Sequence, residues 1–440
     1  MIKNYKLALA ALFLSGSLTL NAQTWEPVGP GNYTSSVSSI VFDGTDIYAN
    51  GNYQNGSDVF SYGKFSGGQW HALGSWKGVP GGIGVVNCAL KVGDDIYVGG
   101  VFTDGAGNPN MDRIARWNIS TQTWHPLGTG LNQYVNSIVQ MGSDIIVGGK
   151  FTNAGGDPNA DFIAKWDGVS WSAISPVVIS TSSFTSVNAL AVNGNDLYIG
   201  GNFENAAGNP AIDYLTRWDG NSFNNVGGWA GQVGAVFSMD IASNGDLYIG
   251  GEFPLKAAKF DGANWTSLGS PTAINQLVRE IKVIGSDVYI GGNFTDVEGI
   301  ATADYIAKFD GTNWSDVGGG LNAYVSKIVS YSGNLYVGGN FTDAGGDVTA
   351  DKFVKLGIST SILEEQNKTN TIIYPNPTNG IVSIQFTNNS STTIELYNVI
   401  GERLISNQTN QSKHSIDISN YPNGVYFLKV DGNITKIIKQ

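Results

Sequence analysis

The 440-residue sequence is poor in the side chains that form covalent cross-links or bind transition metals. It contains one cysteine, Cys88, and three histidines. A single cysteine excludes an intramolecular disulfide, so the core and its hydrogen bonds must hold the fold together. Three scattered histidines leave little material for a Ser–His–Asp triad or a histidine-rich metal site. We therefore expect neither kind of chemistry.

The chain also lacks long apolar runs. A membrane-spanning helix needs about 20 apolar residues, and no run approaches that length. The short run Leu7–Leu14 follows Lys3 and Lys6 and precedes small residues up to Ala22, a pattern typical of a secretory signal peptide. We therefore expect residues 1–22 to be a signal peptide and the mature chain to have no transmembrane segment.

Charged residues are scarce, at 14%, and the formal net charge is −12. Loss of the two lysines in the signal peptide makes the mature chain −14, and this acidic excess lies wholly before residue 359. Such a surface repels phosphate groups, which predicts no nucleic-acid partner. It is compatible with cations, basic partners and neutral glycans.

Glycine is abundant, at 59 residues, and much of it belongs to an internal repeat. The repeated phrase is an apolar run, then Gly-Gly, then Asn-Phe or a close variant. Its seven copies, the first of them weak, begin at Ile47, Ile96, Ile145, Leu197, Leu247, Val288 and Leu335. The spacing of 41 to 52 residues is typical of a β-propeller or a solenoid. Each repeat divides into four short strands rich in β-branched and aromatic residues.

The ends of the array favour a closed ring over a solenoid. Six repeats end in a fourth strand marked by an aromatic residue, whereas the last repeat stops after its third strand, at Gly357. A matching fourth-strand segment surrounds Trp25, ahead of the first repeat. A ring closed by this segment leaves no free sheet edge. We therefore predict an all-β fold, with a seven-bladed β-propeller over residues 23–358 closed by the N-terminal strand.

Phrases such as LYIGGNF (Leu197–Phe203) and AKWDG (Ala164–Gly168) resemble the kelch-like repeat arrays of secreted bacterial propellers. This resemblance covers residues 24–357. It implies the architecture and is nearly silent on activity, because one fold hosts many functions.

A different pattern follows the repeats. Residues 359–370 are polar and are predicted to be a linker, and residues 371–440 show short alternating strands with Pro-Asn-Gly turns, which predict a small β-sandwich. Its motif residues are Tyr374, Pro375, Asn376, Pro377, Gly380, Gly401, Asn423, Gly424, Tyr426 and Lys439.

These motifs resemble the type A C-terminal sorting domain of cargo of the type IX secretion system of Bacteroidetes. The resemblance implies that the secretion machinery is a partner of this domain and guides the chain across the outer membrane. The cargo is then released or anchored at the cell surface.

Two sets of residues are candidates for a site on the loop face of the ring. Acidic residues recur at a spacing of four between the second and third strands of a repeat. They are expected to stabilise turns, with a Ca²⁺ site as the alternative. The members that would bind calcium are Asp157, Asp161, Asp343, Asp347 and Asp351. Trp76 and Trp229 lie outside the repeated phrase, in connections on the same face, and are candidate ligand-binding aromatics.

Three functions remain open on the sequence. The first is a non-catalytic binding or adhesion protein whose ligand, a glycan or a protein, the sequence does not identify. The second is a glycosidase or polysaccharide lyase with paired carboxylates at the mouth of the ring. Acids that break the repeat, such as Glu204, Glu252, Glu280 and Glu298, are the material for such a pair. The third is a structural scaffold.

Overall fold

The structure is a computed structural model, and it places most of the chain. The described residues are 24–30, 33–55, 58–74, 85–176, 179, 185–229, 233–357, 372–374, 376–385, 392–398, 403–409, 411, 413–430 and 433–440. The predicted signal peptide, the linker 359–370, Trp76, Pro375 and Gly401 lie outside them. Two compact units are present, Met1–Thr360 and Ser361–Gln440.

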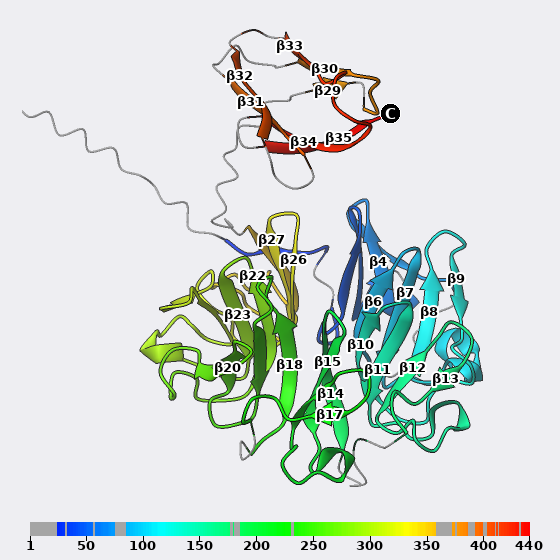
Figure 1. Cartoon of the computed structure of the whole chain (residues 1–440). Helices are drawn as coiled ribbons and strands as arrows, with labels where there is room; N and C mark the ends of the chain where they lie inside the picture. The colour runs from blue at the N-terminus through cyan, green and yellow to red at the C-terminus, as the bar shows by residue number, and fades with distance from the viewer. Residues whose placement is uncertain are drawn as a thin grey trace, which may run out of the picture. The chain divides into compact units, whose positions relative to one another are not determined.

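The first unit consists of seven four-stranded antiparallel sheets, and each sheet is one blade of a propeller (Figure 1). The inner strands of neighbouring blades contact one another around the ring. The inner strands are β2 (Ile40–Asp43), β6 (Val86–Val92), β10 (Val135–Met141), β14 (Ser186–Asn193), β18 (Val236–Ile241), β22 (Val278–Ile284) and β26 (Val325–Tyr331). The second strands are β3 (Asp46–Asn55), β7 (Asp95–Gly100), β11 (Asp144–Gly149), β15 (Asp196–Asn202), β19 (Leu247–Gly251), β23 (Asp287–Gly292) and β27 (Asn334–Gly339).

The outer half of each blade carries shorter strands. The third strands are β4 (Asp58–Ser66), β8 (Ile114–Asn118), β12 (Ile163–Trp166), β16 (Leu215–Trp218), β20 (Ala257–Phe260), β24 (Ile306–Phe309) and β28 (Phe353–Gly357). The outer strands are β5 (Gln69–Ala72), β9 (Thr123–His125), β13 (Trp171–Ser172), β17 (Phe223–Asn224), β21 (Trp265–Ser267), β25 (Trp314–Asp316) and β1 (Glu26–Pro27). Single 3₁₀ turns between second and third strands span Gly105–Gly107, Pro109–Met111, Ala154–Gly156, Ala206–Gly208 and Val297–Gly299.

The N-terminal strand closes the ring, as the sequence predicts. β1 pairs antiparallel with β28, and the Val28 amide donates a hydrogen bond to the Phe353 carbonyl at 3.0 Å. Figure 1 shows the blue N-terminal segment beside the yellow strands of the seventh blade. Trp25 is 4% exposed and packs into the same cluster as Leu335 of β27. The seventh blade is thus built from both ends of the propeller.

The repeated Gly-Gly pair is required by two different close approaches. A Cβ on Gly148 would lie 2.4 Å from Cγ1 of Val187, which belongs to the next blade. A Cβ on Gly149 would lie 2.0 Å from the carbonyl oxygen of Tyr134, the residue just before the inner strand β10. The first glycine therefore lets two blades pack together, and the second lets the inner strand bulge.

Because the two glycines approach different atoms, alanine at each position is expected to lower the free energy of unfolding by a different amount. Gly148→Ala is expected to destabilise the propeller by roughly 1–3 kcal/mol, because it overpacks the contact with a side chain. Combining it with Val187→Ala should recover part of the loss, which a double-mutant cycle by denaturant unfolding measures. Gly149→Ala should cost more and should not be rescued by Val187→Ala, since it meets backbone. Equal costs for the two alanines would contradict this account.

The aromatic residue of the outer strand joins each blade to the preceding one. The indole N–H groups of Trp124 and Trp171 donate hydrogen bonds to the carbonyls of Leu73 and Leu127, at 2.9 and 3.0 Å. Trp265 and Trp314 repeat this bond in later blades. The aromatic at this position therefore serves packing between blades, as the repeat itself suggests.

The second unit is a β-sandwich of two sheets that share one core. The first has the order β29 (Ile372–Tyr374), β30 (Ile381–Gln385), β33 (Lys413–Asp417), and the second has the order β32 (Arg403–Thr409), β31 (Thr392–Tyr397), β34 (Gly424–Val430), β35 (Asn433–Lys439). The last residues are fixed to the first turn, because the Ile438 amide donates to Oδ1 of Asn376 at 2.9 Å. The buried ammonium of Lys439 donates to the carbonyls of Ser419 and Tyr421, at 3.1 and 2.5 Å.

Candidate functional site

A β-bulge occurs at the same place in six of the inner strands. In each of these blades the pairing register shifts just after a fully buried valine, for example between Val86 and Cys88. The bulged residues are Asn87, Asn136, Asn188, Phe237, Arg279 and Ser326. A bulge re-aims the side chains around it. The second glycine of the Gly-Gly pair makes room for this bulge.

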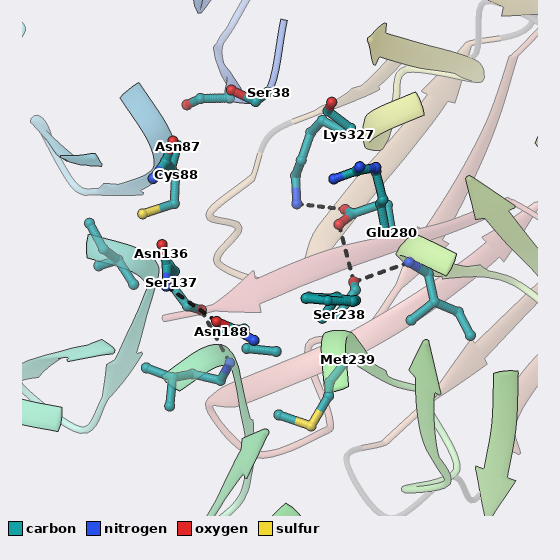
Figure 2. Close-up of a pocket in the computed structure, with 18 of the residues that line it drawn as sticks. Ser38, Asn87, Cys88, Asn136, Ser137, Asn188, Ser238, Met239, Glu280 and Lys327 are labelled. Carbon is teal, nitrogen blue, oxygen red and sulfur yellow. Dashed lines mark hydrogen bonds and ion pairs between the residues drawn. The ribbon is translucent and has the colours of Figure 1, made fainter. Parts of the chain in front are cut away.

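The bulged residues and those that follow them line a cavity of about 310 Å³ in the centre of the ring. All seven blades contribute to this central channel, and Figure 2 shows side chains converging on it from several inner strands. Each inner strand begins at the loop face, the side of the ring that carries the connections between blades. The bulged residues stand near the start of these strands. They therefore lie nearer to the mouth of the channel on the loop face than the residues that follow them.

In the first four blades the side chain at this position links neighbouring blades. Ser38 donates to the carbonyl of Val86 at 3.0 Å, and Asn87 donates to the carbonyl of Val135 at 3.1 Å. Asn136 and Asn188 continue the series to the valines of the fourth and fifth blades, at 3.2 and 3.3 Å. This wall of the channel is polar and uncharged, and its side chains are committed to holding the ring.

The opposite wall is charged. Glu280, 7% exposed, accepts hydrogen bonds from the hydroxyl of Ser238 at 3.1 Å and from the ammonium of Lys327 at 2.6 Å (Figure 2). Asp240 forms an ion pair with Lys282 at 2.9 Å. Both carboxylates in the channel therefore have a lysine partner.

Lys327 is charged although it lies inside the ring. Burial opposes its charge and is the largest single influence. The nearby carboxylate of Glu280 outweighs it with the help of Asp240, so the pKa of Lys327 lies above its usual value. About a third of the side chain is reached by solvent, which fits a cation in a wet, enclosed channel. On the other wall, burial raises the pKa of the Cys88 thiol to about 12, so this thiol is neutral at physiological pH.

The structure corrects the expectation for Trp229. Its side chain is 3% exposed and packs against Phe253 and Trp265, with ring centroids 5.0 and 4.6 Å away. It fills the space beneath a connection, much as the buried Leu131 and Leu321 do in other connections. Trp229 therefore offers no aromatic surface to a ligand on the loop face.

The acidic residues of the loops bond to their own turns. Asp161 accepts from the amide of Asn153 at 2.7 Å, and Asp157 accepts from the amides of Asn159 and Ala173. In the seventh blade Asp343 accepts from Gly346, and Asp347 accepts from Thr349. Within the described ranges, no three His, Cys, Asp or Glu side chains gather in an arrangement that suits a metal ion. These carboxylates therefore take part in their turns, and calcium binding by them stays a prediction.

Asp351 is the exception among these acids. Its Oδ1 is buried and has no hydrogen-bond partner among the described atoms, and burial raises the pKa of its carboxyl above the usual value. The folded state therefore binds more protons than the unfolded chain between the two pKa values. Consequently, the free energy of unfolding falls as the pH rises through that window.

Asp351→Asn should accordingly stabilise the propeller at pH 7, raising its Tm by roughly 1–2 °C, because the substitution removes the cost of a buried charge. The gain should shrink at acidic pH, below the usual pKa of aspartate, because the raised pKa keeps the native carboxyl protonated there. Asp161→Asn is the matched control and should give no gain, since Asp161 accepts a backbone amide. Thermal unfolding at both pH values tests the prediction, and a lower Tm for Asp351→Asn at pH 7 would refute it.

From the sequence, a ligand site was predicted on the loop face, whereas the channel was not predicted. Of the channel residues it singled out Glu280, as an acid that breaks the repeat, but it gave no indication of Arg279, Lys327 or Ser238. The sequence does contain a pattern that marks the channel residues. The two residues after each repeated valine vary between blades, whereas the valine and the Gly-Gly pair hardly vary.

Comparison with known proteins identifies the second unit. Residues 372–440 match the secretion system C-terminal sorting domain family. This match indicates that the chain is cargo exported by the type IX secretion system, to the cell surface or beyond. No curated protein matches the chain in sequence.

Solved structures resemble the chain in fold. A catalytically inactive virginiamycin B lyase from Staphylococcus aureus, solved with quinupristin, has a TM-score of 0.50 and 13% identity, covering 76% of this chain and 99% of its own. A chain of the mitotic checkpoint complex has the same score and identity, covering 81% of this chain and 98% of its own. PorZ, a surface component of the type IX secretion system of Porphyromonas gingivalis, has a TM-score of 0.45 at 12% identity, covering 94% of this chain, which spans 60% of PorZ. At such identities the likeness concerns the fold alone.

No helix in the described part of the chain has the length and apolar character needed to cross a membrane.

Proposed function

We propose that this chain is an exported binding protein that takes its ligand into the mouth of the central channel. The observation that supports it is the difference between the two walls. The neutral wall holds the ring together, whereas the bulged positions of the fifth and sixth blades carry Phe237 and Arg279, which do not continue the series of links. A concave cavity of a few hundred Å³ with a few placed polar groups is a common kind of small-ligand site.

The proposal includes the steps of export. Residues 1–22 act as the signal for the inner membrane, and the sorting domain directs passage through the outer membrane. The propeller is then released or held at the cell surface, where its loop face and channel mouth meet the ligand.

An enzyme is the second candidate, because Asp240 and Glu280 bring two carboxylates from neighbouring blades into one channel. A glycosidase needs one carboxyl that keeps its proton and one that attacks or activates water. Here each carboxylate is paired with a lysine, and both oxygens of Glu280 accept hydrogen bonds. This pairing favours binding over glycoside cleavage.

A plugged channel tests the proposal. Ser326→Trp, at a bulged position, should fill the cavity and weaken binding by at least about tenfold to any ligand found on a glycan and peptide array. Thr266→Trp, on an exposed position of an outer strand, is the matched control and should bind as the wild type does. Equal binding by the two variants, or no ligand on the array, contradicts the proposal. Release of new reducing or unsaturated sugar ends, lost in Glu280→Gln, would favour the enzyme instead.

A further inference from the structure

Arg279 is the cation of the channel lining that lacks an acidic partner. Its guanidinium lies over the ring of Tyr324, 4.7 Å from the centroid, and its Nε donates to Oδ1 of Asn293 at 2.6 Å. Among the described residues, no carboxylate lies within ion-pair distance of it. By contrast, Arg116 and Arg217, on third strands, pair with Asp95 and Asp196.

The contacts of Arg279 fix its orientation without neutralising it. Stacking on Tyr324 holds the guanidinium plane, and Asn293 takes the hydrogen on Nε. The two terminal nitrogens remain as a planar fork, which matches the two oxygens of a carboxylate. Because the group is already oriented, little side-chain entropy is lost when it binds an anion.

The charge of the lining favours an anion as well. Three cations, Arg279, Lys282 and Lys327, face two acids, Asp240 and Glu280, so the channel carries one excess positive charge. The chain as a whole is strongly acidic. Arg279 is exposed, at the end of the channel near the loop face, so the excess positive charge attracts an anion at this mouth.

The size and shape of the channel limit which negatively charged ligands can enter it. A volume of about 310 Å³ corresponds to roughly ten water molecules, at about 30 Å³ each. The blades enclose it on all sides, so a ligand enters end-on from a mouth. A small organic acid or the last residues of a peptide satisfy both conditions. Phe237, at the bulge of the fifth blade, adds an aromatic side chain to the same lining.

We propose that the channel binds a terminal carboxylate, held by Arg279 of the sixth blade, with Phe237 contacting the adjoining apolar group. This rests on the proposed function, because it names the chemistry recognised at the same channel. The free acid and the peptide C-terminus are two sources of one recognised group.

Calorimetric titration of the full chain with matched probes tests the inference. The probes are 3-phenylpropionate and its amide, and the tripeptide Gly-Gly-Phe with a free or an amidated C-terminus. Each carboxylate that binds should do so at least about tenfold more tightly than its amide, the weakening expected from losing a charge-assisted bidentate contact. Binding of the small acid alone identifies a free acid as the source, and binding of the peptide identifies a chain end.

Two variants separate this inference from its alternatives. Arg279→Gln should abolish the preference for carboxylate over amide. Arg113→Gln is the matched control and should keep it, since Arg113 also lies over a tyrosine, Tyr134, but is not part of the channel lining. A preference that survives Arg279→Gln, or no binding of any probe, overturns the carboxylate assignment. Array ligands that remain sensitive to Ser326→Trp would still support the channel as the binding site.

Discussion

Replacing Trp25 by alanine is expected to lower the Tm of the propeller by on the order of 10 °C, a larger loss than for any other single substitution considered for the ring. Trp25 is buried in one cluster with Leu335 of β27, Phe341 and Val354 of β28, all from the other end of the propeller. Truncating a buried tryptophan typically costs about 3–5 kcal/mol. Here it also loosens β1, a short strand whose register with β28 covers Glu26 and Pro27.

Two further variants isolate the cause of this loss. Trp25→Phe should cost much less, because the indole N–H of Trp25 makes no hydrogen bond among the described atoms and the ring keeps most of its contacts. Glu26→Gln removes the surface ion pair with Lys355 and should change the free energy of unfolding by no more than about 1 kcal/mol. A Tm for Trp25→Ala within 2 °C of the wild type would mean that the N-terminal strand does not close the ring.

Lys439→Met should reduce the amount of protein outside the cell by about tenfold or more while leaving the propeller folded. The ammonium of Lys439 is buried and satisfies the carbonyls of Ser419 and Tyr421. Its removal leaves these two carbonyls unpaired, at a cost of about 1–3 kcal/mol for each of them. A module of some 70 residues often has only about 3–5 kcal/mol to lose, so a large fraction of sorting domains would unfold.

Fractionation of cells that produce the variant measures this effect. The control is Lys429→Met, because Lys429 is partly exposed and its ion pair with Glu395 is long, at 3.7 Å. Its export should match the wild type. If Lys439→Met leaves the cell normally while the purified sorting domain shows the expected loss of stability, the link between its fold and export fails.

The sequence was sufficient for the architecture because the same physical contacts recur in most blades. The aromatic residue of the outer strand, the Gly-Gly pair and the valine of the inner strand contact their neighbours in nearly identical ways, so each recurs at a regular spacing in the sequence. The closing strand was predictable for the same reason, since Trp25 is the missing member of one such series. The sorting motifs were predictable from their order and position, although only the fold reveals that Asn376 and Ile438 are joined.

The candidate site was not predictable in this way, because its residues are the ones that do not repeat. Arg279 and Phe237 stand at bulges whose register depends on pairing between strands, and a bulge shifts which side chains face the axis. The prediction for Trp229 was wrong although Trp229, too, lies outside the repeat. A tryptophan outside the repeated phrase resembled a surface anchor, yet it occupies a local gap in the packing that no periodic pattern marks.

The pairing of β1 with β28 also constrains the order in which the molecule matures. Ribosomes make β1 first, but its partner follows roughly 330 residues later. Contacts that span so much of a chain form late in folding, because a long loop must close before they contribute. The seventh blade is therefore the final one to be completed, and the sorting domain leaves the ribosome only after β28. A machinery that reads the C-terminus thus receives a chain whose every blade has already been synthesised.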